Sequence, residues 1–404
     1  MHDRTRRALC RFFFLFMVFL PTLAVTGWSL YATSALGIAS RQEHWQRQLG
    51  QVLGARVTLQ SVRQVFPGTV EIHQLQVQLP GDDHPLARVG QLRITGGQPQ
   101  RVELATVHFS ADQLGHWMEW LERTTRRLDN GAWRVGATQV VMEHGSGKDV
   151  FTEVVGVVEG RPGGSQAIFN LWQESPQGDP LAVQLVHQPE EGGQHRWILQ
   201  SGSNPLPVRV LASRLSPLAR LGSQALFDGQ LTCVGGRQPS RIELVGDFQQ
   251  VDLGSLSGFP ASGMLQGTGQ LRVTRCRILD DACQFLDAQL VSSEGSVDNS
   301  WLRTTGSQWG LQTPPTGLAM QDFSDLYCHL ELDGNGIRIR GKEDGPGKGA
   351  MIRQADRVLL GQPRVEWLSV AQLVELLVPA SQEQLPATEH AARLLRAIEA
   401  PRLR

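Results

Sequence analysis

Two cysteines, Cys276 and Cys283, are the residues whose type and spacing most directly suggest chemistry. They flank the segment Arg277-Ile-Leu-Asp-Asp-Ala282 and lie symmetrically about a turn near Leu279 and Asp280. Across a β-hairpin, such a pair reaches the short Cβ separation that a disulfide needs. The sequence therefore predicts a disulfide between Cys276 and Cys283, with two unrelated half-buried thiols as the alternative.

The other chemistry-bearing residues form no catalytic or metal-binding motif. The histidines are scattered, without the HxH, HExxH or mixed Cys/His spacing of metal sites. The sequence also has no GxSxG elbow and no phosphate loop with GxxxxGK[ST] spacing. We expect no metal, no cofactor and no catalytic residue. An exported glycan hydrolase stays open as a minor alternative, because its two carboxylates need to meet only in space.

The first structural element that the sequence predicts is an uncharged stretch near the N-terminus. No charged residue lies between Arg11 and Arg41, and the stretch follows the basic residues Arg4, Arg6, Arg7 and Arg11. It exceeds the ~20 apolar residues that cross a bilayer, and the arginines favour a cytoplasmic N-terminus. We therefore predict a cytoplasmic basic tail over 1–11, a transmembrane helix over 12–38 and a body outside the cytoplasm. The predicted anchor side chains are Phe12, Phe16 and Leu20, with Trp28 and Tyr31 at the interface.

A cleaved signal peptide is the alternative for the same stretch. Its densest apolar run, Phe12 to Leu20, is short, and Pro21 interrupts it, as in the apolar region of a secretory signal. Either interpretation exports the rest of the chain, so the predicted location is the inner membrane with the body in the periplasm or extracytoplasmic space.

Composition narrows the class of the exported body. The chain has 404 residues, a formal net charge of -1 and a pI of about 6.8. Such a balance provides no basic field for nucleic acid, so we expect no nucleic-acid partner. Charged residues make up only 19% and glycines number 43, which favours turns and extended segments over long solvated helices.

Period-two alternation of apolar residues recurs along the body and predicts a mainly β fold. Examples are Leu181 to Leu185, Ile242 to Leu244, and Leu330 with Leu332 followed across Asp333-Gly-Asn-Gly336 by Ile337 and Ile339. Short alternating strands between turn residues are typical of antiparallel meanders. The expected architecture is an elongated antiparallel β-groove or sandwich with a few short capping helices. Its predicted parts are a linker helix over 39–54, a first β-rich region over 55–220 with a helix over 110–128, a second β-rich region over 221–380 and a C-terminal helix over 381–404.

One alternating set is the candidate lining of a groove. Val70 and Ile72 alternate, and Leu75, Val77 and Leu79 resume the alternation with the phase shifted by one residue. A β-bulge near His73 and Gln74 would return both sets to one face. Such a face would shield acyl chains if it were open, or fill an ordinary sandwich core if it were closed.

Several of these segments together resemble the AsmA-like envelope proteins. The resemblance includes the N-terminal apolar helix, Val57-Thr-Leu59, the Pro67-Gly68 turn and Val70-Glu-Ile-His-Gln-Leu75. It continues through Phe227-Asp-Gly-Gln-Leu231, Phe248-Gln-Gln-Val-Asp-Leu253, Gly267-Thr-Gly-Gln-Leu271 and Ser293-Ser-Glu-Gly-Ser-Val297. The resemblance implies an anchored, periplasm-facing β-groove with an apolar concave face, linked to outer-membrane assembly and lipid transport. It implies no catalytic residue.

The sequence thus favours a non-catalytic, single-pass envelope protein that handles phospholipid or another lipid, or that supports outer-membrane assembly with other envelope proteins. The alternative is an anchored β-sandwich that serves as a scaffold or binding module for a protein or glycan. Both functions need the same tether and the same β-rich body, so they differ only in whether the apolar face is open.

Overall fold

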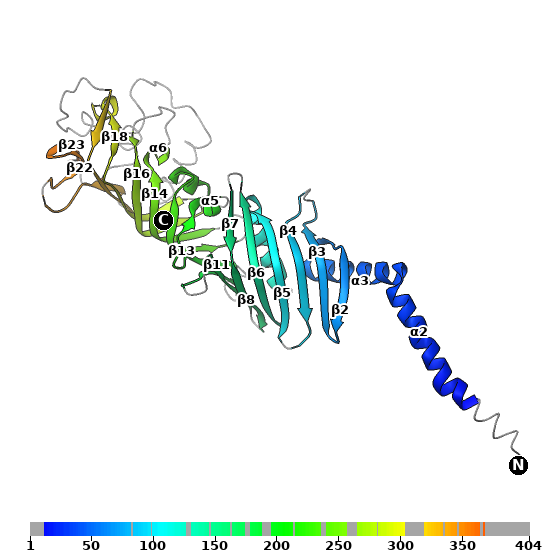
Figure 1. Cartoon of the computed structure of the whole chain (residues 1–404). Coiled ribbons are helices and arrows are strands. Elements are labelled where there is room, and N and C mark those ends of the chain that lie inside the picture. The colour runs from blue at the N-terminus through cyan, green and yellow to red at the C-terminus, as the bar shows by residue number, and fades with distance from the viewer. Residues whose placement is uncertain are drawn as a thin grey trace, which may run out of the picture. The chain divides into compact units, whose positions relative to one another are not determined.

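The computed structural model describes residues 12–81, 84–97, 99–126, 131–144, 147–161, 164–173, 178–187, 195–212, 215–235, 240–256, 265–280, 282–303, 319–333, 336–345, 347–363 and 367. Antiparallel strands make up most of this part of the chain, with a few short helices (Figure 1). The prediction of a mainly β fold is confirmed. The predicted C-terminal helix over 381–404 lies outside the described residues.

The N-terminal apolar stretch forms successive helical pieces: a π-helix η1 (Leu15–Phe19), α2 (Leu20–Thr33) and α3 (Ala35–Leu53). The prediction of one helix over 12–38 is wrong, because the chain leaves the helical conformation at Ser34. There the backbone is extended, with φ -71° and ψ 154°, and the Ser34 hydroxyl accepts a 3.1 Å hydrogen bond from the Gly37 amide. Ser34 is therefore the N-cap of a new helix.

Among the residues that the structure describes, no helix is both long enough and apolar enough to cross a membrane.

Helix α3 contains the predicted linker helix over 39–54 and begins earlier, at Ala35. It ends at Gly54, which has a left-handed backbone (φ 60°). The backbone N–H of Gly54 donates a hydrogen bond to the Gly50 carbonyl, which closes the last turn. The helix packs against strands β1 (Arg56–Thr58) and β2 (Ser61–Phe66). The Gln42 side-chain amide donates to the carbonyls of Leu59, at 2.5 Å, and Gln60, at 2.9 Å, where the chain passes from β1 to β2.

The chain divides into two compact units. Unit 1 contains residues 1–109 and 133–141, and unit 2 contains residues 110–132 and 142–404. The predicted boundary near residue 220 is not where the chain divides. Strand β11 (His195–Gln200) pairs with β13 (Leu226–Val234) across it, so a single sheet continues through that point.

In unit 1, β1 and β2 both pair with β3 (Thr69–Gln78), which pairs with β4 (Ala87–Thr95), and β4 pairs with β5 (Gln100–Ser110). The core-facing phase of β3 changes at Gln74, which has a left-handed φ of 52°. The pairing register with β4 is the same on both sides of Gln74, so no extra residue is inserted as the predicted bulge required. Instead, the neighbouring strands change phase at the same level.

This shared change of phase is called the crease below. Pairs of core-facing residues three apart, rather than two apart, mark it on each strand: Leu59 and Val62, Ile72 and Leu75, Val89 and Leu92, Leu104 and Val107. The cross-strand pairs Ile72 with Leu92 and Leu75 with Val89 lie on either side of it. The whole sheet of unit 1 therefore switches core-facing positions along one line.

Unit 2 is built on an antiparallel meander of successively paired strands: β8, β9, β10, β11, β13, β14, β16, β17, β20 and β21. Besides β11 and β13, the strands of this meander are β8 (Glu153–Arg161), β9 (Gly164–Trp172), β10 (Leu181–His187), β14 (Arg241–Asp252), β16 (Thr268–Leu279), β17 (Ala282–Ser292), β20 (Asp325–Asp333) and β21 (Gly336–Arg340). Strands β12 (Leu206–Pro207), β22 (Ala350–Gln354) and β23 (Arg357–Gly361) add to it, while β15 (Leu265–Gln266), β18 (Gly295–Asp298) and β19 (Met320–Phe323) form a second small sheet. The predicted hairpin from Leu330 to Ile339 is confirmed as β20 and β21.

Strands β6 (Ala132–His144) and β7 (Gly147–Phe151) complete the described strands. The short helices are η2 (Ala111–Gln113), α4 (Leu114–Arg126), α5 (Val208–Ala212), η4 (Ser216–Leu221) and α6 (Leu253–Leu256). The predicted helix over 110–128 is η2 followed by α4, which packs over β8, β9 and β10. On its inner side, the buried Glu122 carboxylate accepts a 2.6 Å hydrogen bond from the Trp197 indole N–H.

One apolar core of unit 2 gathers residues from both its sheets. It includes Leu253, Val297, Phe323, Ile352 and Leu360, all nearly inaccessible to solvent. Burying such side chains contributes about 1.5–3 kcal/mol each relative to exposure. This core fixes the small sheet β15–β18–β19 against the strands β22 and β23.

Candidate functional site

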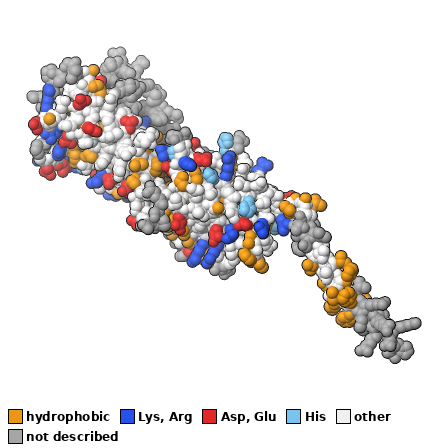
Figure 2. All heavy atoms as spheres, in the orientation of Figure 1, with side chains coloured by type: hydrophobic (Ala, Val, Ile, Leu, Met, Phe, Trp, Pro, Cys, Tyr) orange, Lys and Arg blue, Asp and Glu red, His pale blue; other side chains and the backbone are white. Residues whose placement is uncertain are grey.

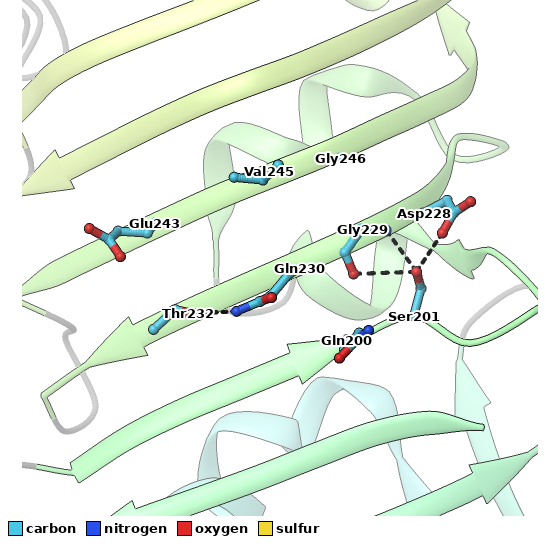
Figure 3. A pocket seen from close by; sticks show the side chains of 9 residues that line it. All are labelled: Gln200, Ser201, Asp228, Gly229, Gln230, Thr232, Glu243, Val245 and Gly246. Atoms are coloured by element: carbon cyan, nitrogen blue, oxygen red, sulfur yellow. Dashed lines mark hydrogen bonds between the residues drawn. The ribbon is translucent and has the colours of Figure 1, made fainter. Parts of the chain in front are cut away.

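The described part of unit 2 has a polar hollow on one face of its sheet, across β11, β13 and β14. Figure 3 shows the side chains around it, which are Gln200, Ser201, Asp228, Gly229, Gln230, Thr232, Glu243, Val245 and Gly246. Cross-strand pairing puts Gln230 beside Val245 and Thr232 beside Glu243. Because side chains alternate along strands, the opposite face carries the apolar partners Leu231 and Leu244. The hollow therefore belongs to the polar face of the sheet.

Ser201 forms hydrogen bonds with two residues at one end of the hollow. Its hydroxyl donates to the Asp228 carboxylate at 2.7 Å and accepts from the Gly229 amide at 2.7 Å (Figure 3). Gly229 lies directly opposite Gly246, and a Cβ on either glycine would overlap backbone of the neighbouring strand. The strands approach closely here because both side chains are missing, which fixes the local shape of the sheet.

Two carboxylates beside the hollow are paired with arginines. Glu243 binds Arg241 at 2.6 Å and Arg277 at 3.1 Å. The hydrogen bond from Arg241 is the largest of the effects that lower the pKa of Glu243 below its usual range. Nearby, Asp247 binds Arg272 at 2.7 Å. Asp228 is held by the Ser201 hydroxyl, so the hollow presents amides, hydroxyls and one carboxylate. Such a surface is suited to a neutral polar group and not to an anion.

The carboxylates of this face are poorly arranged for glycoside hydrolysis. Asp228 and Glu243 are separated by about four strand positions, roughly 13 Å, beyond the ~5–9.5 Å of glycosidase pairs. Asp228 lies directly opposite Asp247, but the two are bound to Ser201 and Arg272, and Asp228 is exposed on an open face. A glycosidase needs an enclosed acid with a raised pKa, and this arrangement does not support one. Within the described ranges, no group of three His, Cys, Asp or Glu side chains is placed to hold a metal ion.

The predicted groove lining in unit 1 is mostly packed. Ile72 is 0% exposed, and Leu75, Val77 and Leu79 are 4%, 6% and 5% exposed. Val70 is half-buried. They belong to a core with Val57, Val89 and other side chains of the neighbouring strands. The structure therefore favours the sandwich-core alternative for these five positions.

A second apolar surface, in unit 2, is covered only in part. We define the apolar face of unit 2 as Leu244, Leu271, Val273, Cys276, Ile278, Leu286, Ala288, Leu330, Leu332, Ile337 and Ile339, which share one side of β14, β16, β17, β20 and β21 by direct cross-strand pairing. Within it, Leu286, Leu330 and Leu332 are half-buried. The remainder includes four buried residues, Leu244, Val273, Ala288 and Ile337, and Ile339, which packs against the core of unit 2. Polar and charged residues such as Asp287 and Glu331 occupy the other side. The alternation of these strands was visible in the sequence, but it did not indicate which sheet would be less covered.

The predicted anchor residues lie in the N-terminal helical segment. Phe12, Phe16 and Leu20 are 62%, 59% and 54% exposed, and further apolar side chains around them are also exposed. Figure 2 shows hydrophobic side chains gathered on this segment. Trp28 and Tyr31 belong to α2, and their side chains lie outside the described part of the structure.

The two cysteines are not directly opposite each other, although their symmetric spacing predicted that they would be. Cys276 pairs with Leu286 and Cys283 pairs with Ile278, with a register shift between Arg277 and Ile278. Both side chains nevertheless lie on the apolar face of unit 2, at diagonal positions of neighbouring strands. The predicted disulfide is not formed in this structure, in which both are thiols.

No protein-family model matches this sequence, and comparison with curated proteins finds no match either. Functional assignment therefore depends on the surfaces described above.

Proposed function

We propose that this protein is a non-catalytic, membrane-attached envelope protein that binds lipid acyl chains on the apolar face of unit 2. The observation that carries the proposal is that this face spans several strands and leaves Leu286, Leu330 and Leu332 half-buried. Hydrocarbon chains are bound by such surfaces because apolar area leaves water, contributing about 25 cal/mol per Å². The packed residues of unit 1, including Ile72 and Leu75, are not part of the proposed surface.

The exposed N-terminal segment supports the membrane attachment. Large apolar side chains such as Phe12, Phe16 and Val25 are 62%, 59% and 68% exposed, which is costly in water and favourable in a bilayer. The basic residues before this segment favour a cytoplasmic N-terminus. Single-pass insertion in the inner membrane, a periplasmic body and a role in outer-membrane assembly are the parts of the proposal that come from sequence patterns and from the family resemblance.

Photo-cross-linking tests the lipid surface directly. Leu332 and Glu331 are neighbours on β20 that face opposite sides of the sheet, apolar and polar respectively. A photoreactive amino acid is placed at each position in the full-length protein, the cells are irradiated, and the purified protein is analysed by mass spectrometry. We expect a lipid adduct at 332 and none at 331.

A second pair of positions, Leu286 and Asp287 on β17, repeats the comparison one strand away. We expect adducts at 286 and not at 287. If irradiation at 332 and 286 yields only cross-links within the chain, or if the polar positions capture lipid equally, the proposed acyl-binding surface is wrong. Membrane fractionation of the same samples tests the attachment separately.

The polar hollow favours one alternative function, a binding module for a neutral glycan or a protein. Its amides and hydroxyls, Gln200, Gln230 and Thr232, offer donors and acceptors without a net charge. Substituting Gln230 by Ala while leaving the apolar face intact separates the two functions. Loss of a copurified glycan or protein, with lipid adducts retained at 332, would favour the binding module.

A further inference from the structure

The hairpin of β16 and β17 brings two thiols together on one face. Cys276 and Ile278 are two positions apart on β16, so they share a face, and their partners on β17 are Leu286 and Cys283. The register shift between Arg277 and Ile278 leaves Gln284 without a partner in the pairing. The two cysteines thus occupy diagonal corners of a four-residue patch, and each thiol influences the pKa of the other.

The surroundings of the two thiols differ. The Cys283 thiol lies 3.5 Å from the Phe285 carbonyl, and the hydrogen bond from Cys276 stabilises its anion, which lowers its pKa. The same contact, together with burial, raises the pKa of Cys276. Because the thiolate is the nucleophile in thiol chemistry, Cys283 is the more reactive member of the pair. Both side chains are half-buried and within reach of a small reagent.

We propose that Cys276 and Cys283 form a reversible dithiol–disulfide site that reacts with low-molecular-weight disulfides. The pairing does not place the two Cβ atoms directly opposite each other, whereas an unstrained bridge prefers close and well-aligned Cβ atoms. Strained disulfides are the more easily reduced ones. The site is therefore suited to repeated oxidation and reduction and not to permanent stapling. This inference does not depend on the lipid function.

The reaction with oxidised glutathione balances as two exchanges. The Cys283 thiolate attacks one glutathione sulfur, forming a mixed disulfide and expelling a glutathione thiolate. Cys276 then loses its proton and attacks the Cys283 sulfur, which forms the Cys276–Cys283 bond and expels the second glutathione. Two protein thiols are oxidised, one glutathione disulfide is reduced to two thiols, and both protons leave with them.

The sequence makes the product easy to identify. Arg275, Arg277 and Arg303 are successive tryptic sites, so digestion separates the dipeptide Cys276-Arg277 from the peptide of residues 278–303, which contains Cys283. Full-length protein is equilibrated in buffers of varied oxidised and reduced glutathione, quenched with an alkylating reagent and digested. We expect the two peptides to become linked as the oxidised fraction increases, and to separate again when the buffer is made reducing.

Variants assign the roles within the pair. In Cys276→Ser, the mixed disulfide on Cys283 has no resolving thiol, so a glutathione adduct should accumulate there. In Cys328→Ser, the linkage should be unchanged, because burial raises the pKa of Cys328 to about 12 and its partner on β17 is Leu290. Alkylation of Cys283 should be at least about tenfold faster than that of Cys328.

The unfolded chain is the control for detection. In urea, the same buffers should link Cys276 to Cys283 through random encounters, which shows that the peptide pair is observable. If both cysteines of the folded protein remain free thiols in those buffers and are alkylated in the quench, the proposal is wrong. It is also wrong if the reaction stops at a glutathione adduct on Cys283. A linkage of either residue to Cys233 instead would also overturn it.

Discussion

Among single residues of unit 2, Glu122 on α4 is unusual because its carboxylate is buried. It is 6% exposed, and the Trp197 indole donates to it at 2.6 Å. A buried carboxylate that loses one hydrogen-bond donor keeps its desolvation cost and loses part of the compensation for it. The contact joins α4 to strand β11, which is 75 residues further along the chain.

Trp197→Phe keeps most of the ring volume and removes only this donor. We expect the free energy of unfolding to fall by about 1–3 kcal/mol, measured by urea denaturation. The matched variant is Glu122→Gln, with the double variant closing a cycle. A coupling energy near zero between the two positions would show that the hydrogen bond contributes little.

Glu243 makes stability depend on pH. Its folded-state pKa is lowered from the ordinary value of 4.5, chiefly by the hydrogen bond from Arg241. The unfolded chain therefore binds a proton at higher pH than the folded chain does. The stabilisation is fully present above pH 4.5 and is lost as pH falls through the lower folded-state pKa.

We expect the urea midpoint of Glu243→Gln to fall less steeply than that of the wild type below about pH 4.5. In an Arg241→Gln background, the additional effect of Glu243→Gln on this slope should shrink, because the main cause of the pKa shift is gone. Equal slopes for the wild type and Glu243→Gln would contradict this assignment.

Among the elements, helix α3 is joined to the first strands of unit 1 by a glutamine side chain. Ser34 caps its first turn, and Gln42 bonds the carbonyls of Leu59 and Gln60. Those carbonyls lie where β1 gives way to β2, so Gln42 supplies donors at a break in the strand. The contact holds the helix on the edge of the sheet.

Gln42→Ala should loosen α3 without unfolding unit 1. We expect faster amide hydrogen exchange in α3 and at β1, about threefold to tenfold for a loss near 1 kcal/mol. Gln48→Ala changes an exposed glutamine of the same helix and is the matched control. If both variants exchange alike, the Gln42 contacts do not hold the helix.

The strands were largely predictable from sequence, whereas their faces and registers were not. The alternation of apolar and polar residues identified β20 and β21, because this period of two can be recognised within a short stretch of sequence. Ile72 and Leu75 alternate in the same way whether they fill a core or line a groove, so their burial had to come from the packing of neighbouring strands. The offset of Cys276 and Cys283 depends on a register shift, which is a backbone feature that residue spacing does not encode.

For the whole molecule, the main question is whether the exposed apolar N-terminal segment holds the protein at a membrane. Phe16 and Leu20 are 59% and 54% exposed and lie in successive helical pieces. The double variant Phe16→Lys and Leu20→Lys should move the protein from the membrane pellet to the supernatant after alkaline extraction. Each lysine costs about 2.5–3.5 kcal/mol near the bilayer centre.

Val52→Lys is the matched control for this substitution. Val52 is 45% exposed on α3, outside the segment from Phe12 to Thr33. We expect Val52→Lys to fractionate like the wild type. A double variant that stays in the pellet as completely as the wild type would show that the segment does not hold the protein at the membrane.

The crease in unit 1 restricts how this sheet can change length during evolution. Deleting one residue at Gln74 would turn Leu75 and Val77 toward water while Val89 and Val107 on the next strands still faced inward. Indels at this line are therefore tolerated only when adjacent strands acquire compensating ones. Drift among descendants of this gene should leave strand lengths here almost fixed while the connecting turns vary freely.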